Sequence, residues 1–206
     1  MKENNDYTNL TILLPAGRLP LTIMSKVSEL AEKYPFSIYL STQQNLRLTN
    51  VLKEHEAVIR EKLLELGAEF KGPGKFPIPR ICVGSPHCNL GVIDTEAFSL
   101  KILDHFSGRK HTKAKLKIAV SGCTLSCAGT KTSDIGLLST RNGFEIYVGG
   151  KGGSMPKVGR RIKQGVDESE ALTIIEELVN FHERKTGKKQ RMYKLLSDPE
   201  FPYQEE

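Results

Sequence analysis

SGCTLSC, residues 121–127, holds two of the four cysteines in this chain of 206 residues, and CVGSPHC, residues 82–88, holds the other two. The pattern reads C-x5-C, a gap of 34 residues, and C-x3-C. Glycines lie beside both pairs, and glycine permits the tight turns that bring backbone N–H groups close to sulfur. Two close cysteine pairs in one chain indicate metal or redox chemistry.

The start of the chain bears on the compartment in which these cysteines act. Residues 1–9 are polar and lack the apolar core of a signal peptide. The longest apolar run, LTILLP, is far shorter than the roughly 20 residues of a membrane helix. We therefore expect a cytoplasmic protein without a membrane span, in which disulfides are not the default use of cysteine.

The cysteine spacing narrows the kind of site. Structural zinc sites favour two to four residues between paired ligands, which the five-residue spacer at 82–88 fits poorly. A thioredoxin-like C-x-x-C motif is absent, so dithiol exchange is not indicated. Four thiolates from two loops match the requirement of a cubane iron–sulfur cluster. The spacing favours an iron–sulfur cluster, and a zinc-stabilised basic module remains the alternative.

Composition and charge are those of a globular protein that handles anions. The chain is 38% hydrophobic and 26% charged, with a formal net charge of +6. Basic residues gather at 108–117 and 183–191. Basic surface can bind nucleic acid, but neither an aromatic single-strand platform nor zinc-finger spacing accompanies it. We expect an anionic cofactor or a small anionic substrate, and no nucleic acid.

The first third of the chain predicts a sheet backed by helices. Residues 9–15, 36–41 and 44–51 read as strands, and apolar residues recur at helical spacing over 20–34 and 53–67. This order is typical of a small α+β layer. Residues 67–80 then contain three glycines and three prolines, which indicates a boundary. We predict one domain at 1–70 and a second at 71–206.

The second domain predicts a helix at 94–106 and a strand at 115–120 that leads into the second cysteine pair. Arg141-Asn142-Gly143 separates two apolar runs and is typical of a hairpin turn, because Asn-Gly tolerates positive φ. Residues 167–185 predict a long helix with Asp167 at its N-terminal cap. The overall expectation is an α+β protein whose second domain is α/β.

These motifs carry a resemblance to a known family. C-x5-C followed by S-G-C-x3-C, D-I-G-L and Y-V-G-G-K-G-G resembles the sirohaem and 4Fe-4S module of the sulfite and nitrite reductase haemoproteins. RLPLTIMSKVSELAEKYPFSIYLSTQQNLRLTNV, residues 18–51, resembles the ferredoxin-like half-domain that precedes this module. Full-length members contain two copies of the two-part unit. This sequence contains one, so it is similar to the low-molecular-weight assimilatory type or to an isolated half.

The resemblance implies a cofactor, a reaction and partners. It implies that Cys82, Cys88, Cys123 and Cys127 ligate one 4Fe-4S cluster, and that Cys127 also bridges to the iron of sirohaem. The implied reaction is the reduction of sulfite to sulfide or of nitrite to ammonia. No flavin or nicotinamide motif is present, so a ferredoxin-like protein or another donor protein would deliver the electrons.

Basic and glycine residues complete the implied site. The family's K-x-K strand before the second cysteine pair is matched by Lys115 and Lys117, which on a strand would share one face. Arg47 and Arg80 are further candidates for binding the substrate or the sirohaem carboxylates. The glycine-rich loop at 148–160 adds Gly149, Gly150, Lys151 and Gly152 as cofactor contacts, because exposed N–H groups can bind anions.

The sequence departs from the family pattern at two points. Gln43 stands where the family often has a substrate-facing arginine, and Arg47, four residues on, is expected to replace it from the same strand. Thr124 and Leu125 stand where proline and asparagine are common. The departures leave open a non-catalytic iron–sulfur or sirohaem electron-transfer protein. The missing repeat would leave a sheet edge uncovered, so a homodimer or a partner subunit is a further expectation.

Overall fold

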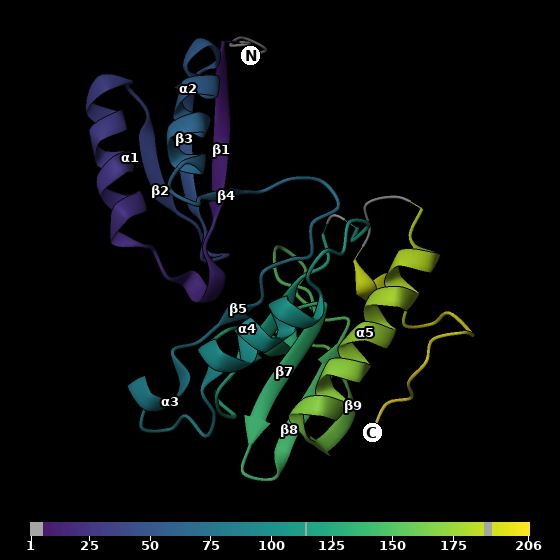
Figure 1. Ribbon diagram of the computed structural model, residues 1–206. Coiled ribbons are helices and arrows are strands. Elements are labelled where there is room, and N and C mark those ends of the chain that lie inside the picture. The colour runs from purple at the N-terminus through teal and green to yellow at the C-terminus, as the bar shows by residue number, and fades with distance from the viewer. Residues whose placement is uncertain (1–5, 114, 188–190) are drawn as a thin grey trace. The chain divides into compact units, whose positions relative to one another are not determined.

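The computed structural model describes residues 6–113, 115–187 and 191–206, and the chain separates into two compact units, 1–72 and 73–206 (Figure 1). The sequence placed the boundary after residue 70, inside the same glycine- and proline-rich stretch. Each unit has its own sheet. The predicted α+β fold is confirmed. Within the described ranges, no helix is long and apolar enough to cross a membrane.

The first unit is an antiparallel sheet of four strands, in the order β2-β3-β1-β4, with two helices. A short 3₁₀ helix, η1, follows the first strand. The elements are β1 (Tyr7–Leu13), η1 (Pro15–Gly17), α1 (Leu21–Lys33), β2 (Ser37–Leu40), β3 (Leu46–Leu52), α2 (Lys53–Leu64) and β4 (Glu69–Phe70).

One hydrophobic core holds the first unit together. Figure 1 shows α1 and α2 on the same face of the sheet. Leu46 and Leu48 alternate along β3 and are buried in this core. Because side chains alternate across a strand, Arg47 between them lies on the opposite face of the sheet. The outer strand β2 contributes nothing to the core, since all four of its residues are exposed.

The second unit is a five-stranded sheet in the order β5-β6-β7-β8-β9. The first three strands are parallel to one another, and the last three are antiparallel. The elements are β5 (Arg80–Ile81), α3 (Gly84–His87), α4 (Thr95–His105), β6 (Ile118–Ser121), the 3₁₀ helix η2 (Thr130–Thr132), β7 (Ile135–Thr140), β8 (Gly143–Val148), β9 (Arg160–Val166), α5 (Glu168–Lys185) and the 3₁₀ helix η3 (Met192–Lys194).

The local signals of the second unit account for most of these elements. Asp94 caps α4 by accepting hydrogen bonds from the N–H groups of Glu96 and Ala97, each at 3.0 Å. Asp167 caps α5 in the same way, and the predicted hairpin joins β7 to β8. Figure 1 shows α4 and α5 along one face of the sheet. The rings of Phe98 and Phe144 stack there, with centroids 4.7 Å apart.

One expectation about the second unit was wrong, and one strand was missed. The strand predicted at 115–120 begins only at Ile118, because Lys115 has φ of 82° and lies in a turn. The N–H of Lys117 is bound by the carboxylate of Asp134 rather than by a neighbouring strand. The glycine-rich stretch 148–160 is a loop as expected, but it runs directly into β9, which the sequence did not predict.

Candidate functional site

The two cysteine loops emerge from the same edge of the second sheet. β5 and β6 are parallel neighbours, with Arg80 opposite Ala119 and Ile81 opposite Val120. Cys82 follows β5 directly, and Cys123 comes two residues after the end of β6. Because parallel strands end at the same edge of a sheet, the topology brings together two loops whose nearest cysteines are separated by 34 residues.

The first loop is folded tightly against the start of α4. The hydroxyl of Thr95 donates to the carbonyl of Cys82 at 2.6 Å, and the N–H of Ser85 donates to the carbonyl of Ile93 at 2.8 Å. The N–H of Gly91 donates to the carbonyl of Cys88 at 2.9 Å and closes the end of the loop. Both cysteines of this loop therefore have fixed backbone positions.

The second loop contacts the first through backbone. The N–H of Gly122 donates to Sγ of Cys82 at 3.1 Å, and its carbonyl accepts from the N–H of Val92 at 2.8 Å. A Cβ on Gly122 would lie 3.0 Å from Cα of Gly84, so this contact leaves little room for a side chain. An N–H group aimed at a cysteine sulfur is the kind of contact that stabilises a thiolate.

The four cysteines are free thiols with different exposure. Cys82, Cys88 and Cys123 are partly buried, and Cys127 is exposed. Among the described residues, no group of three or more His, Cys, Asp or Glu side chains is gathered closely enough to hold a single metal ion. A single-ion zinc site is thus not preformed. In a cubane cluster each thiolate binds a different iron, so its sulfurs need not converge on one point.

The structure places Lys115 and Lys117 at the other end of β6 from the cysteines. They precede Ile118, whereas Cys123 follows Ser121. At about 3.3 Å per residue, the backbone of Lys117 lies ~13 Å from that of Ser121. Lys115 is exposed, Lys117 is partly exposed and Leu116 between them is buried. The predicted strand is absent here, yet both lysines still point away from the core.

Arg80 and Arg47 have different surroundings. Nε of Arg80 donates to the carbonyl of Ala128 at 2.6 Å, and burial lowers the pKa of this guanidinium below its ordinary value. In the first unit, Nε of Arg47 is buried without a hydrogen-bond partner among the described residues. Gln43 lies in the turn before β3 and not on the strand, so the expected shared strand face with Arg47 does not exist.

The first part of the glycine-rich loop is packed against other segments of the chain. Gly149 and Gly150 are buried, and a Cβ on Gly150 would lie 2.5 Å from the carbonyl oxygen of Lys131. Gly152 is exposed and has no atom within 4 Å of its Cβ position. Lys151 lies over the ring of Tyr193 at 5.3 Å. The exposed part of this loop thus begins after Gly150.

Sequence analysis missed the structural role of Asp134, the aspartate of the D-I-G-L motif. Its carboxylate is fully buried and accepts hydrogen bonds from Nε of Arg191 at 2.7 Å and from the backbone N–H groups of Lys117 and Met192, each at 2.9 Å. Burial raises the pKa of Asp134, and Arg191 acts in the opposite direction. Asp134 thereby joins the segment before β6 to the C-terminal part of the chain.

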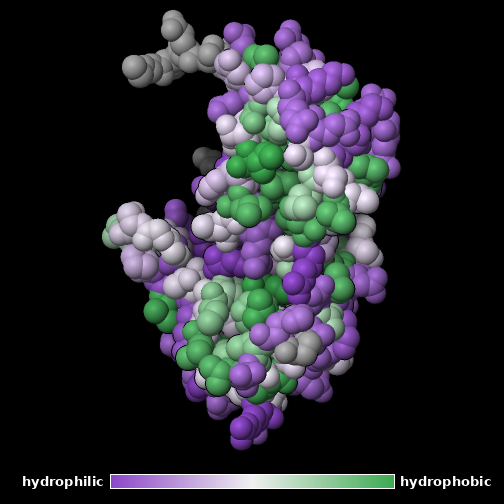
Figure 2. All heavy atoms as spheres, turned by 90° about the vertical axis from the view of Figure 1, so that its left-hand side faces the viewer, coloured by the Kyte–Doolittle hydropathy of each residue, from purple (hydrophilic) through white to green (hydrophobic). Residues whose placement is uncertain are grey.

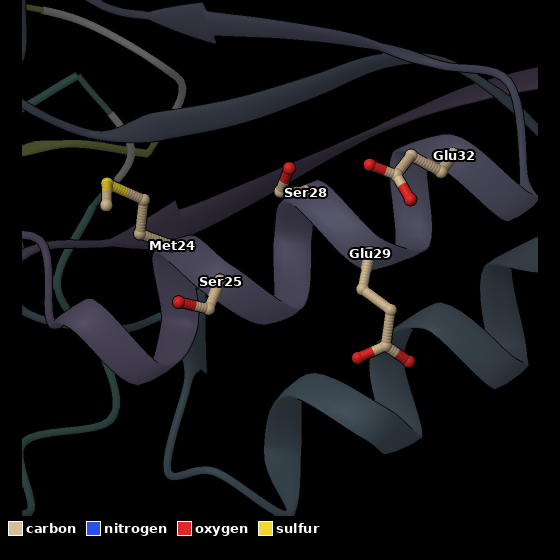
Figure 3. Close-up of a pocket in the computed structure, with 5 residues that line it drawn as sticks. All are labelled: Met24, Ser25, Ser28, Glu29 and Glu32. Carbon is tan, nitrogen blue, oxygen red and sulfur yellow. The ribbon is translucent and has the colours of Figure 1, made fainter.

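A depression elsewhere on the surface does not fit the expected anionic ligand. It lies on α1 in the first unit and is lined by Met24, Ser25, Ser28, Glu29 and Glu32 (Figure 3). Two of these five residues are acidic. A carboxylate-lined depression repels anions, so we leave it out of the candidate site.

Each of the two units matches a model of a known protein family. A model of the nitrite/sulfite reductase ferredoxin-like half domain matches residues 1–66, and a model of the nitrite and sulphite reductase 4Fe-4S domain matches residues 78–199. The chain belongs to the nitrite and sulfite reductase family. The family predicted from the cysteine spacing and its flanking motifs is thus confirmed.

Relatives of this reductase family member differ greatly in length. The assimilatory-type sulfite reductase of Nitratidesulfovibrio vulgaris is 27% identical over 88% of this chain and 83% of its own length. The NAD(P)H nitrite reductase of Emericella nidulans is 27% identical over 94% of this chain and 18% of its own length. The NAD(P)H nitrite reductase large subunit of Klebsiella oxytoca is 29% identical over 86% of this chain and 19% of its own length. The chain thus spans less than a fifth of the two nitrite reductases.

Solved structures share the fold of this family member. The Mycobacterium tuberculosis NirA protein has a TM-score of 0.74 at 18% identity, over 95% of this chain and 40% of its own. Dissimilatory sulfite reductase I has a TM-score of 0.73 at 11% identity, over 91% and 65%. At these identities the likeness establishes the arrangement of helices and strands.

The residues of this reductase family protein fit an iron–sulfur cluster. The donor set consists of four free thiols on two loops, and a backbone N–H already points at one sulfur. The departures from the family pattern are exposed or in turns: Leu125 is 64% exposed at the tip of the second loop.

Proposed function

We propose that this protein is a reductase of a small oxyanion, which converts sulfite to sulfide or nitrite to ammonia with a 4Fe-4S cluster and sirohaem. The observation that carries the proposal is the pair of cysteine loops at the ends of β5 and β6, connected by the contact between Gly122 and Sγ of Cys82. Membership of the nitrite and sulfite reductase family supports the reaction class.

Cys82, Cys88, Cys123 and Cys127 would hold the cluster. Cys127 would be the thiolate shared with the sirohaem iron, and its exposure supports this role because the macrocycle must reach the sulfur from outside. When bound, the two cofactors would supply electrons one at a time to the substrate, which takes up six in all. The protein's part is to fix the thiolates and to bind the anions.

Positive charge on the second unit supports a role in anion binding. Residues 1–72 contain nine Lys or Arg and nine Asp or Glu, so the net charge of +6 belongs entirely to residues 73–206. We propose that Lys115, Lys117 and Lys151 bind carboxylates of sirohaem or the substrate. Arg47, whose Nε lacks a partner among the described residues, is a further candidate for an anion.

The electrons would come from outside residues 1–206, since these carry no flavin or nicotinamide motif. We propose a ferredoxin-like donor. One relative is named a ferredoxin–nitrite reductase, from Arabidopsis thaliana, and it is 27% identical over 81% of this chain. The basic second unit would attract an acidic donor over long range, and this attraction would weaken as salt is added.

The alternative is an electron-transfer protein that retains the cofactors without useful turnover. Gln43 and Leu125 favour it, since each replaces a residue common in the family. The exposure of Leu125 shows that the loop tip offers an apolar side chain where an amide is usual. The two functions share the same cysteine ligands and differ in whether the bound anion is reduced.

The first experiment is an absorption spectrum of anaerobically purified protein, with iron and acid-labile sulfide counted on the same sample. We expect haem-like bands in the red and near-ultraviolet, with iron in excess of sulfide. Reduction of sulfite or nitrite by a strong artificial reductant then separates the reductase from the electron-transfer protein. Zinc without iron or sulfide would contradict both.

The proposed anion-binding role of the lysines has its own test. We expect Lys115→Ala combined with Lys117→Ala to lower sirohaem content or to raise KM for the oxyanion by about tenfold, as the loss of a charge-assisted contact does. Lys101→Ala, which removes an exposed lysine paired with Glu168, is the control. Unchanged cofactor content and unchanged KM in the double variant would remove these lysines from the site.

A further inference from the structure

Arg80 connects the segment of Cys82, the first of the four cysteines, to the segment of Cys127, the last. It lies in β5, two residues before Cys82, and its Nε donates to the carbonyl of Ala128 at 2.6 Å. Ala128 is the residue directly after Cys127. The two partners are 48 residues apart in the chain, so this one side chain joins regions that the sequence does not bring together.

The second loop is closed on itself at the point where Arg80 binds. The N–H of Ala128 donates to Oγ of Ser121 at 3.1 Å, and this bond is buried. Residues 121–128 therefore form a closed loop whose base is Ser121 and Ala128. The N–H group of Ala128 secures this base, while its carbonyl accepts the hydrogen bond from Arg80.

Two contacts thus attach this loop to the segment at 80–82. At its beginning, the N–H of Gly122 donates to Sγ of Cys82 at 3.1 Å, and at its end the carbonyl of Ala128 accepts from Arg80. The first contact holds the end of the loop that carries Cys123, and the second holds the end that carries Cys127. Without Arg80, the Cys127 end of the loop would lose its bond to β5 and keep its hydrogen bonds to the segment 129–131.

Glycine at position 129 gives an independent observation of the same contact. Gly129 has φ of +67°, and a Cβ built there would lie 2.4 Å from Nη2 of Arg80. The guanidinium therefore occupies the space that any larger residue at 129 would need. The chain after Cys127 is packed around the side chain of Arg80.

We infer that Arg80 is a positioning residue that holds Cys127 in place relative to Cys82, so that both thiolates can ligate one cluster. The inference rests on the proposed 4Fe-4S cluster and adds a second role to a residue that the sequence suggested for anion binding. Arg80 acts through the backbone of Ala128 and touches no reacting atom.

The test is the rate at which a chelator removes iron from the purified holoprotein, followed by the bleaching of the cluster absorption. We expect Arg80→Ala to accelerate bleaching about tenfold or more, the usual effect of losing a residue that orients metal ligands. Arg80→Lys should bleach at a rate between those of Arg80→Ala and the wild type. Gly129→Ala should accelerate bleaching as well. Arg80 is still present in this variant, but the new Cβ displaces its guanidinium.

Matched controls separate this effect from general damage. Gly165→Ala places a side chain at a similar φ of +70°, but its nearest neighbour is 3.5 Å away, in a strand at the far edge of the sheet. Arg161→Ala removes a partly exposed arginine from that same strand. Both controls should bleach at the wild-type rate. If Arg80→Ala fails to fold, the Arg80→Lys and Gly129→Ala variants answer the question.

The outcomes are distinct. Wild-type bleaching rates in Arg80→Ala and Gly129→Ala would overturn the inference, as would a raised KM for sulfite or nitrite in Arg80→Ala without faster bleaching. A wild-type protein with a cluster but no reductase activity would overturn the proposed reaction and leave the bleaching test valid. A wild-type protein without iron and sulfide would overturn the proposed cofactor and this inference together.

Discussion

Cys127 differs from the other three cysteines in its exposure, and this difference sets what its removal should do. We expect Cys127→Ser to lower iron and acid-labile sulfide strongly and to abolish haem-like absorption, because one thiolate would serve two cofactors. The measurement is iron, sulfide and the absorption spectrum of anaerobically purified protein. His87→Ala, an exposed substitution inside the first loop, should keep both cofactors. Full sirohaem absorption in Cys127→Ser would assign the shared sulfur elsewhere.

Asp134 and Arg191 form a buried ion pair whose effect on stability depends on pH. Burial raises the pKa of Asp134 above its ordinary 3.8 despite the opposing hydrogen bonds. A carboxyl whose pKa is raised by folding contributes stability that is complete below about pH 3.8 and is lost as the pH rises through the folded pKa. Arg191 lowers this pKa, so removing it extends the loss to higher pH.

We therefore expect Arg191→Ala to destabilise the protein by about 3 kcal/mol near pH 7, because a buried carboxylate loses its partner. The loss should shrink as the pH is lowered towards 4. Urea unfolding between pH 4 and pH 8 measures it, with Arg184→Ala, which breaks an exposed pair with Glu200, as the control. An equal loss at both ends of this range would mean that Asp134 is not the titrating group.

At the scale of elements, β7 and η2 touch so closely that glycine is required between them. A Cβ on Gly136 in β7 would lie 2.1 Å from the carbonyl oxygen of Thr130 in η2. We expect Gly136→Ala to cost about 3 kcal/mol, because backbone must move to relieve the overlap. Gly152→Ala, with no atom within 4 Å, should stay within about 0.5 kcal/mol of the wild type in the same unfolding experiment.

The elements also show how far the sequence could predict the fold. Asp167 predicted the start of α5, and Asn142-Gly143 predicted the turn after β7, because caps and tight turns are local interactions. The strand β9 was missed, since it contains Gly165 and its pairing with β8 shifts register. The two-residue strand β5 is too short for any periodic signal.

In the candidate site, too, features set by a short segment could be predicted, and contacts between distant segments could not. The cysteine loops could be predicted because spacing and flanking glycines are properties of a short segment. The bond from Arg80 to Ala128 and that from Arg191 to Asp134 join residues 48 and 57 apart, and no local pattern encodes them. The strand predicted for Lys115 and Lys117 failed for the same reason, since Asp134 comes from a distant segment to bind the N–H of Lys117.

At the scale of the whole molecule, we propose that the outer edge of β2 pairs with a second copy of this chain. All four residues of β2, Ser37–Leu40, are exposed and none is charged. Leu21 and Met24 on α1 are also exposed, and Figure 2 shows apolar side chains on this face of the first unit. Two copies of β2 can pair antiparallel about a twofold axis, with Ile38 of one copy opposite Tyr39 of the other.

Charge favours this pairing over one through the basic unit. Residues 1–72 carry no net charge, whereas residues 73–206 carry +6, so two second units repel each other. We expect the protein to be a dimer by sedimentation and Leu40→Lys to be a monomer, because a charge on an edge strand opposes edge-to-edge pairing. Met155→Lys is the matched control, since Met155 is 70% exposed and Leu40 69%. A wild-type monomer, or a Leu40→Lys dimer, would exclude β2 as the interface.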